Sequence, residues 1–204
     1  MATDRRTLLI HAAFDLFARR AYDEVTTAEI ARRAGVSYGL LAHHFDNKRG
    51  IYLATIHAAA DRIRAMQDAP RGDTPMARLR DAISSHIRYA DDNAAGYLTL
   101  MRGGSGSDPE VRAIIDDLRA GAARRILTAI GAADPAPPVL RAAMRGWTGY
   151  LDELVLDHLD HDDVPLDHLV ELAAAALVTA VRTAVALDPR TGLTPEAVDA
   201  LTGD

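Results

Sequence analysis

Hydrophobic positions recur with helical spacing along most of this chain. Near the N-terminus, the spacing i, i+3, i+4, i+7 is occupied by Ile10, Ala13, Phe14 and Phe17. The same spacing recurs in four later segments, at residues 76–87, 111–126, 139–160 and 165–187. Helical faces are recognised by this period, and no segment shows the alternation typical of a strand. The pattern therefore predicts an all-α fold.

Two short helices are predicted directly after the first one, which we expect to end near residues 21–23. Thr26 and Glu29 have the spacing of a capping box, so a helix should begin there. Gly35 can adopt the positive φ that ends a helix, and Ser37 is a favoured N-cap for a second helix over about 37–44. Two short helices and a tight turn are typical of a helix-turn-helix, although any αα-hairpin can share this spacing.

The residues of this segment make the prediction more specific. They resemble the DNA-binding signature of the tetracycline-repressor (TetR) family. The matching positions are Thr26, Thr27, Ile30, Ala31, Ala34, Gly35, Val36, Ser37, Gly39, Leu41, His43, His44, Phe45, Asn47 and Lys48. With the first helix included, the resemblance covers about 45 residues.

The resemblance implies an N-terminal three-helix domain with a helix-turn-helix, at residues 1–47. It also implies a larger helical domain for ligand binding and dimerisation, at 48–204. The exposed part of the recognition helix would carry Ser37, Tyr38, Gly39, Leu40 and His43. The positions that meet phosphates or support that contact would be Thr27, His44 and Lys48, while Ile30, Leu41 and Phe45 are assigned to the core.

Two positions depart from the family pattern. Ala42 stands where the family usually has Tyr, and Ala21 stands where it usually has Gly. The missing tyrosine removes one expected phosphate contact, which Tyr38 or His43 could replace. Lys48 is the only lysine in the chain and lies at a helix start, where the helix dipole does not favour a cation. A phosphate partner would explain it, and a solvated side chain is the alternative.

The charge is unevenly distributed. The whole chain carries −6, with a pI of about 5.7. Residues 1–50 contain eight Lys and Arg against six Asp and Glu, a net +2, which leaves −8 for residues 51–204. This asymmetry permits contact with nucleic acid at the N-terminal end only.

The chain has no cysteine, which excludes disulfides, thiolate metal sites and a cysteine nucleophile. The N-terminal residues lead into an amphipathic segment rather than a signal sequence, and no uninterrupted apolar run approaches ~18 residues. We therefore expect a cytoplasmic protein without a membrane partner.

The C-terminal region combines apolar bodies with a few polar tips, a mixture typical of small-molecule pockets. The candidate ligand-binding residues are His86, Tyr89, Tyr97, Met101, Met144, Trp147 and Tyr150. Each of them could equally belong to the core or to a dimer interface. If they form a pocket, they favour a mainly apolar or aromatic effector with one or two hydrogen-bonding groups. The sequence predicts neither a cofactor nor a metal.

Two long helices are candidates for a homodimer interface. The segment 165–187 is apolar on more than one side and contains the small residues Ala173–Ala176, which allow close helix approach. Together with the segment 139–160 it predicts a two-fold four-helix interface. Beyond it, Thr194-Pro195-Glu196 could begin one last short helix.

The main alternative is a helical metal- or ligand-binding protein or enzyme that has lost DNA binding. It rests on the imidazoles and carboxylates of Asp157–Asp163, which could ligate a divalent metal. A charged helix end explains them as well, and no convincing nucleophile lies nearby. A structural interaction module leaves the N-terminal signature unexplained. The sequence thus predicts a DNA-binding regulator rather than an enzyme, and the resemblance favours a repressor, while operator, effector and regulated genes stay open.

Overall fold

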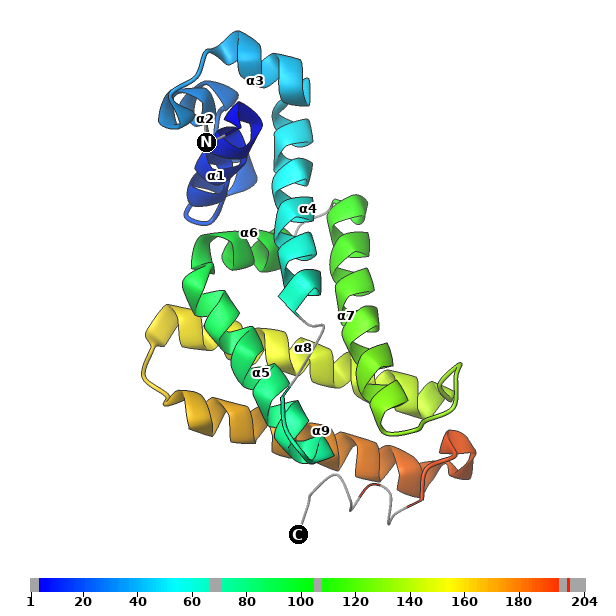
Figure 1. Cartoon of the computed structure of the whole chain (residues 1–204). Helices are drawn as coiled ribbons and strands as arrows, with labels where there is room; N and C mark the ends of the chain where they lie inside the picture. The colour runs from blue at the N-terminus through cyan, green and yellow to red at the C-terminus, as the bar shows by residue number, and fades with distance from the viewer. Residues whose placement is uncertain (1–3, 67–70, 105–107, 195–197, 199–204) are drawn as a thin grey trace. The chain divides into compact units, whose positions relative to one another are not determined.

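The computed structural model describes residues 4–66, 71–104, 108–194 and 198. These residues form helices joined by loops and contain no strand, so the all-α prediction is confirmed. The α-helices, coloured in chain order in Figure 1, are α1 (Arg5–Phe17), α2 (Thr27–Ala34), α3 (Tyr38–Phe45), α4 (Lys48–Met66), α5 (Pro75–Asp92), α6 (Ala94–Gly104), α7 (Pro109–Ala129), α8 (Pro138–His161) and α9 (Leu166–Leu187). Two 3-10 turns are η1 (Tyr22–Glu24) and η2 (Pro189–Thr191).

The chain packs into two compact units. Unit 1 comprises Met1–Ile63 and Asp92–Ile115, and unit 2 comprises Arg64–Asp91 and Asp116–Asp204. Unit 1 therefore contains the predicted helix-turn-helix together with α6 and the start of α7. This grouping reflects packing alone, and a functional boundary between residues 47 and 48 stays a prediction.

The core of unit 1 is built around α1. Its apolar face is buried and packs on α2, α3 and α6. The Thr99 hydroxyl of α6 donates to the Ala95 carbonyl at 2.7 Å and lies 3.3 Å from the Phe14 carbonyl of α1. Gly96 lets α6 approach closely, because a Cβ there would lie 3.2 Å from the Phe14 ring. These contacts attach α6 to the N-terminal helices.

Two boundaries differ from the sequence prediction. The first helix ends at Phe17 rather than near residues 21–23, and the chain then forms η1. There the Arg20 guanidinium donates to the Glu24 carbonyl and to the Glu29 carboxylate, so the end of α1 is set by contacts outside the helix. The break between α5 and α6 at Asn93 was not predicted, because neither proline nor glycine marks it.

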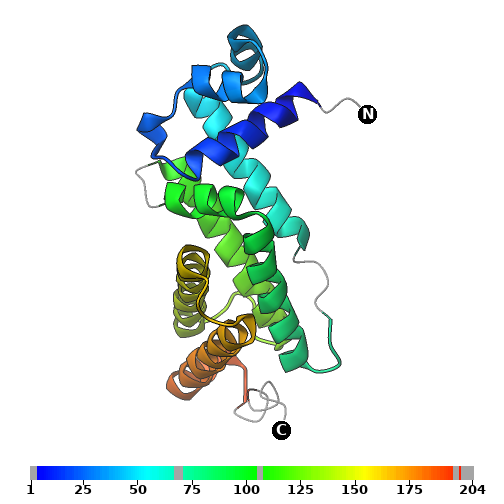
Figure 2. The same ribbon diagram turned by 90° about the vertical axis from the view of Figure 1, so that its left-hand side faces the viewer.

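Unit 2 is organised around α8 and α9, which lie side by side in Figures 1 and 2 and pack along each other. The Trp147 indole N–H of α8 donates to the Ala173 carbonyl of α9 at 2.9 Å. The residues that α9 buries are Leu169, Val170, Ala173, Ala174, Leu177, Val178, Val181 and Ala184. By length and composition alone α9 could cross a membrane, with half of its most apolar window buried. Because α9 packs on α8, its apolar composition is that of a core helix.

The prediction of a short helix beginning at Thr194 concerns residues 195–197 and 199–204, which lie outside the described residues.

Candidate nucleic-acid interface

The turn between α2 and α3 is fixed by local hydrogen bonds. The Thr26 hydroxyl accepts from the Glu29 amide at 3.2 Å, and the Glu29 carboxylate accepts from the Thr26 amide at 3.0 Å, which completes the capping box. Gly35 ends α2 with a φ of +67°. The Ser37 hydroxyl then accepts from the Leu40 amide at 3.3 Å. All three local predictions are confirmed, and together they set the start of α3.

Two ion pairs hold α2 in place. Arg20 lies 2.9 Å from the Glu29 carboxylate, and this hydrogen bond, with those from Thr26, lowers the pKa of Glu29 to about 2. Arg33 of α2 lies 2.6 Å from Asp15 of α1. Exposed pairs of this kind contribute little to stability, so their main effect is on the placement of α2.

The inner sides of these short helices form a small core. Ile30 is 0% exposed, Leu41 is 1% exposed and Phe45 is 6% exposed. These three residues therefore lie in the core, as the sequence indicated. Burial of one side of α3 leaves its other side turned toward solvent.

The solvent side of α3 carries the residues predicted to read DNA. Tyr38 is 59% exposed, and Gly39 has no atom within 4 Å of the place where a Cβ would lie. The remaining exposed positions are Ser37, His43 and His44, while Leu40 is half-buried. A helix with one buried side and one open side, preceded by a capped turn, has the geometry needed to enter a major groove.

The two predicted phosphate positions outside α3 both lie in the first turn of a helix. Thr27 is the first residue of α2 and is half-buried, and Lys48 is the first residue of α4. The Lys48 ammonium lies 4.4 Å from the centre of the Tyr22 ring, a cation–π contact that the sequence did not reveal. Tyr22 itself stacks on Phe17 and meets Tyr52 edge to face. Lys48 is therefore held against an aromatic cluster, and its contact with phosphate stays a prediction.

The corner between α3 and α4 is tightly constrained. Asp46 has a φ of +57°, and the Asn47 side chain accepts from the Gly50 amide at 2.9 Å. A Cβ on Gly50 would lie 2.0 Å from the Phe45 carbonyl oxygen. Only glycine allows α4 to start this close to the end of α3.

Arg49, next to Lys48, is used differently. Its guanidinium donates to Asp108 at 3.2 Å and to Glu110 at 2.8 Å, both near the start of α7. The hydrogen bond from Arg49 lowers the pKa of Asp108. Because carboxylates neutralise it, Arg49 offers less charge to a phosphate than its position in the sequence suggests.

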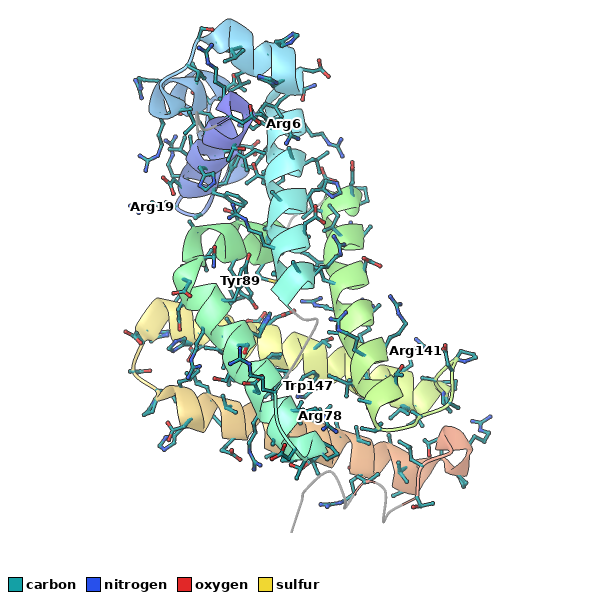
Figure 3. All side chains as sticks on the ribbon, viewed as in Figure 1. Arg6, Arg19, Arg78, Tyr89, Arg141 and Trp147 are labelled. Atoms are coloured by element: carbon teal, nitrogen blue, oxygen red, sulfur yellow. The ribbon has the colours of Figure 1, made fainter. Side chains whose placement is uncertain are left out.

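The candidate ligand-binding residues divide between the two units. In unit 2, Met144 and Trp147 are buried on α8, and His86 and Tyr89 are half-buried on α5. Tyr150, also on α8 of unit 2, is 39% exposed. The other two candidates lie on α6 in unit 1, where Tyr97 is buried and Met101 is half-buried. Figure 3 labels Tyr89 on α5 and Trp147 on α8. Their role in ligand binding stays a prediction.

Two of these side chains have properties that bear on that prediction. Burial lowers the pKa of His86 to about 4, so its imidazole is neutral at pH 7 and can both donate and accept a hydrogen bond. The indole N–H of Trp147 is already used by the Ala173 carbonyl. Trp147 would therefore offer a ligand its ring rather than its polar atom.

Each of the two histidines in the last turn of α8 lies close to one carboxylate, that of His158 coming from α5. His158 Nε2 lies 3.1 Å from Asp91, and His161 Nδ1 lies 3.3 Å from Asp157. Within the described part of the chain, no group of three or more His, Asp or Glu side chains is arranged to hold a metal ion. These pairs are those of a charged helix end.

The fold and this surface define a helical protein with an N-terminal helix-turn-helix. Residues 9–55 match the family model of bacterial regulatory proteins, tetR family. Residues 75–180, about half of the chain, match the model of the tetracyclin repressor-like C-terminal domain. The chain belongs to the TetR family, and the resemblance noted in the sequence is confirmed.

Individual relatives agree with this assignment. A tetR-family transcriptional regulator from Streptomyces coelicolor is 30% identical with a TM-score of 0.82, covering 100% of this chain and 91% of that one. The HTH-type transcriptional activator FasR of Mycolicibacterium smegmatis is 32% identical over 112 residues, 54% of this chain and 51% of FasR. The chain thus spans about half the length of this curated relative. FadR of Bacillus subtilis, solved in complex with stearoyl-CoA, is 22% identical with a TM-score of 0.67, covering 85% of this chain and 98% of FadR, and shows the shared fold.

Proposed function

We propose that this protein is a cytoplasmic, ligand-responsive transcriptional repressor that binds a palindromic or pseudo-palindromic operator as a homodimer and releases it when a small effector binds. The observation that carries the proposal is the exposed face of α3, held in place by a capped turn and a buried inner side. The relatives are regulators rather than enzymes, which supports the same class.

The contacts with DNA follow from the position of each side chain. Tyr38 and His43 on the open side of α3 would reach base edges, and Ser37 and Gly39 would allow close approach at the helix start. Thr27 and Lys48 would meet phosphates, since a hydroxyl and an ammonium at the starts of α2 and α4 suit an anion, and His44 would support that contact from the last turn of α3. Tyr38 is the best-placed replacement for the tyrosine that is absent at Ala42, because it is an exposed aromatic side chain of α3 with a hydroxyl group.

A homodimer through α8 and α9 would place two recognition helices on one operator. Leu172 on α9 is 50% exposed and Tyr150 on α8 is 39% exposed, so both helices keep apolar surface outside the core of one chain. The small residues Ala175 and Ala176 on α9 would allow close approach of a second copy. The two α3 helices would then meet half-sites ~34 Å apart.

The effector would be a mainly apolar or aromatic molecule with one or two hydrogen-bonding groups. FadR of Bacillus subtilis, which shares the fold, was solved with stearoyl-CoA, so the fold can hold a ligand that carries a long apolar acyl chain. In this chain the candidate lining residues with polar groups on α5 are His86 and Tyr89. An effector can act only if it binds the DNA-free arrangement more tightly than the DNA-bound one.

The first experiment selects DNA from a random-sequence pool and compares the best site with scrambled DNA across a salt series. We expect an inverted repeat, bound by two chains, with a steep salt slope and a large specificity ratio. Tyr38→Ala and Lys48→Ala should each weaken binding, and Lys48→Ala should also reduce the slope by about one unit for each phosphate that the ammonium neutralises. Absence of enrichment and of salt-dependent binding would contradict the proposed function.

Three further measurements test the remaining parts. Sedimentation at micromolar concentration should show a dimer that Leu172→Glu dissociates, and a monomeric wild-type protein contradicts the dimer.

A thermal-shift screen should find apolar or aromatic compounds that stabilise the protein, and stabilisation by highly charged metabolites alone argues against the proposed effector. A reporter gene placed behind the selected operator should be repressed by this protein. Activation of the reporter, the direction of regulation that the name of FasR gives, would contradict the proposed repressor.

A further inference from the structure

Arg6 lies in the first turn of α1, at a position that the DNA-binding signature does not include. The Asp4 carboxylate accepts from the Arg6 amide at 3.2 Å and caps this helix. The side chain reaches α3, where its Cζ lies 5.3 Å from the centre of the Phe45 ring. Figure 3 labels Arg6 on α1. The start of α1 is therefore joined to the end of the helix that carries the predicted DNA-reading residues.

The arginines of unit 1 differ in how they are neutralised. Arg20, Arg33 and Arg49 each make an ion pair with a carboxylate. Within the described residues, Arg6 has no carboxylate at ion-pair distance, although it is held over a ring. A guanidinium that stacks through its face keeps the N–H groups along its edge free, and these match the geometry of a phosphate. Arg6 is thus a positioned cation with unused donors.

The arrangement at Arg6 repeats the one at Lys48. Each cation lies in the first turn of a helix, where the dipole does not favour it, and each rests on an aromatic ring, Tyr22 for Lys48 and Phe45 for Arg6. Phe45 is next to His44, whose ring lies 6.1 Å away between centres. Arg6 and the predicted phosphate residue His44 therefore lie against the same ring.

We propose that Arg6 is a second cationic phosphate site of the operator interface, which binds a DNA backbone phosphodiester beside the end of α3. This inference rests on the proposed DNA-binding function. Contact with Phe45 restricts the side chain before DNA arrives, so less conformational entropy is lost on binding. Because a phosphate contact carries no base information, Arg6 adds affinity and salt dependence without altering the preferred sequence.

The test measures the affinity of the full chain for the selected operator between 50 and 200 mM salt, for wild type, Arg6→Gln, Arg6→Lys and Arg88→Gln. Arg88 is an exposed arginine of α5 in unit 2 and serves as the matched control for loss of one charge. A dimer carries two copies of Arg6, so Arg6→Gln should reduce the slope of log K against log salt by about 1.8 units, at about 0.9 per phosphate. Wild type would then lose about 12-fold more affinity than Arg6→Gln over this range.

The further variants separate charge from fold. Arg6→Lys should keep most of the wild-type slope, and Arg88→Gln should keep all of it. The base preference from the selection should be the same for wild type and Arg6→Gln, and their thermal midpoints should agree within about 2 °C, which corresponds to less than 1 kcal/mol. An unchanged slope in Arg6→Gln, or an equal loss in Arg88→Gln, overturns the proposal while the regulator itself stands. Failure of wild type to bind DNA overturns both.

Discussion

Substitution of Gly50 by alanine tests whether backbone packing or helix propensity has the larger effect on stability at this position. In an ordinary helix, Gly→Ala stabilises by about 1 kcal/mol. At Gly50, however, the added Cβ would lie 2.0 Å from the Phe45 carbonyl oxygen and 3.1 Å from its carbon, both of which are backbone atoms. Ordinary carbon–oxygen contacts need about 3.3 Å, so the end of α3 must move by more than about 1 Å.

The expected change in unfolding free energy is the difference between these two opposing effects. Overpacking against atoms that cannot rotate away costs up to about 3 kcal/mol, and helix propensity offsets about 1 kcal/mol of it. We therefore expect Gly50→Ala to lose about 2 kcal/mol of unfolding free energy. For a chain of 204 residues this lowers Tm by about 4–8 °C.

The assay is thermal unfolding followed by far-UV circular dichroism. The matched control is Gly39→Ala in α3 of the same unit, where nothing lies within 4 Å of the added Cβ. Gly39→Ala should raise Tm by up to about 4 °C, so the two variants should shift in opposite directions. A Gly50→Ala protein as stable as wild type would refute the close approach of α3 and α4.

Three further predictions concern single interactions. Thr26→Ala should lose about 1 kcal/mol of stability, because the capping box at the start of α2 is removed, and chemical denaturation should show it as a lower midpoint. Trp147→Phe should also lose about 1 kcal/mol by the same measurement, because the buried hydrogen bond from the indole to the Ala173 carbonyl is removed, and an unchanged midpoint would count against this hydrogen bond. His86 has a folded pKa of about 4 against 6.5 unfolded, so its contribution is present above pH 6.5 and is lost as pH falls toward 4. The stability of His86→Gln should therefore depend less on pH over this interval, and an identical pH profile would disprove the assignment.

The helix-turn-helix could be predicted because its signals are local. The capping box of Thr26 and Glu29, the positive φ of Gly35 and the cap of Ser37 each depend on residues within four positions along the chain. Such interactions form whenever the backbone is helical, so the sequence alone reveals them. The family signature of this segment rests on the same residues, which is why the fold class and the family could both be predicted.

The missed features depend on contacts between residues distant in sequence. Lys48 meets Tyr22, and Arg6 meets Phe45 across 39 positions, so neither contact has a periodic signal. A partial signal existed for Arg6, since a cation in the first turn of a helix is unfavourable without a partner, as at Lys48. The ligand-binding residues were least predictable, because a pocket consists of side chains from several helices whose packing no local pattern records.

The single lysine of this chain also makes a chemical probe available. Lys48 carries the only side-chain amine, so an amine-selective acylating reagent modifies one known side chain. Its rate depends on how often the Lys48 side chain leaves the Tyr22 ring, 4.4 Å away. A bound phosphate should slow the reaction further. The acylation rate, measured by mass spectrometry with and without DNA, would thus show how fully DNA occupies the Lys48 position in the unmutated protein.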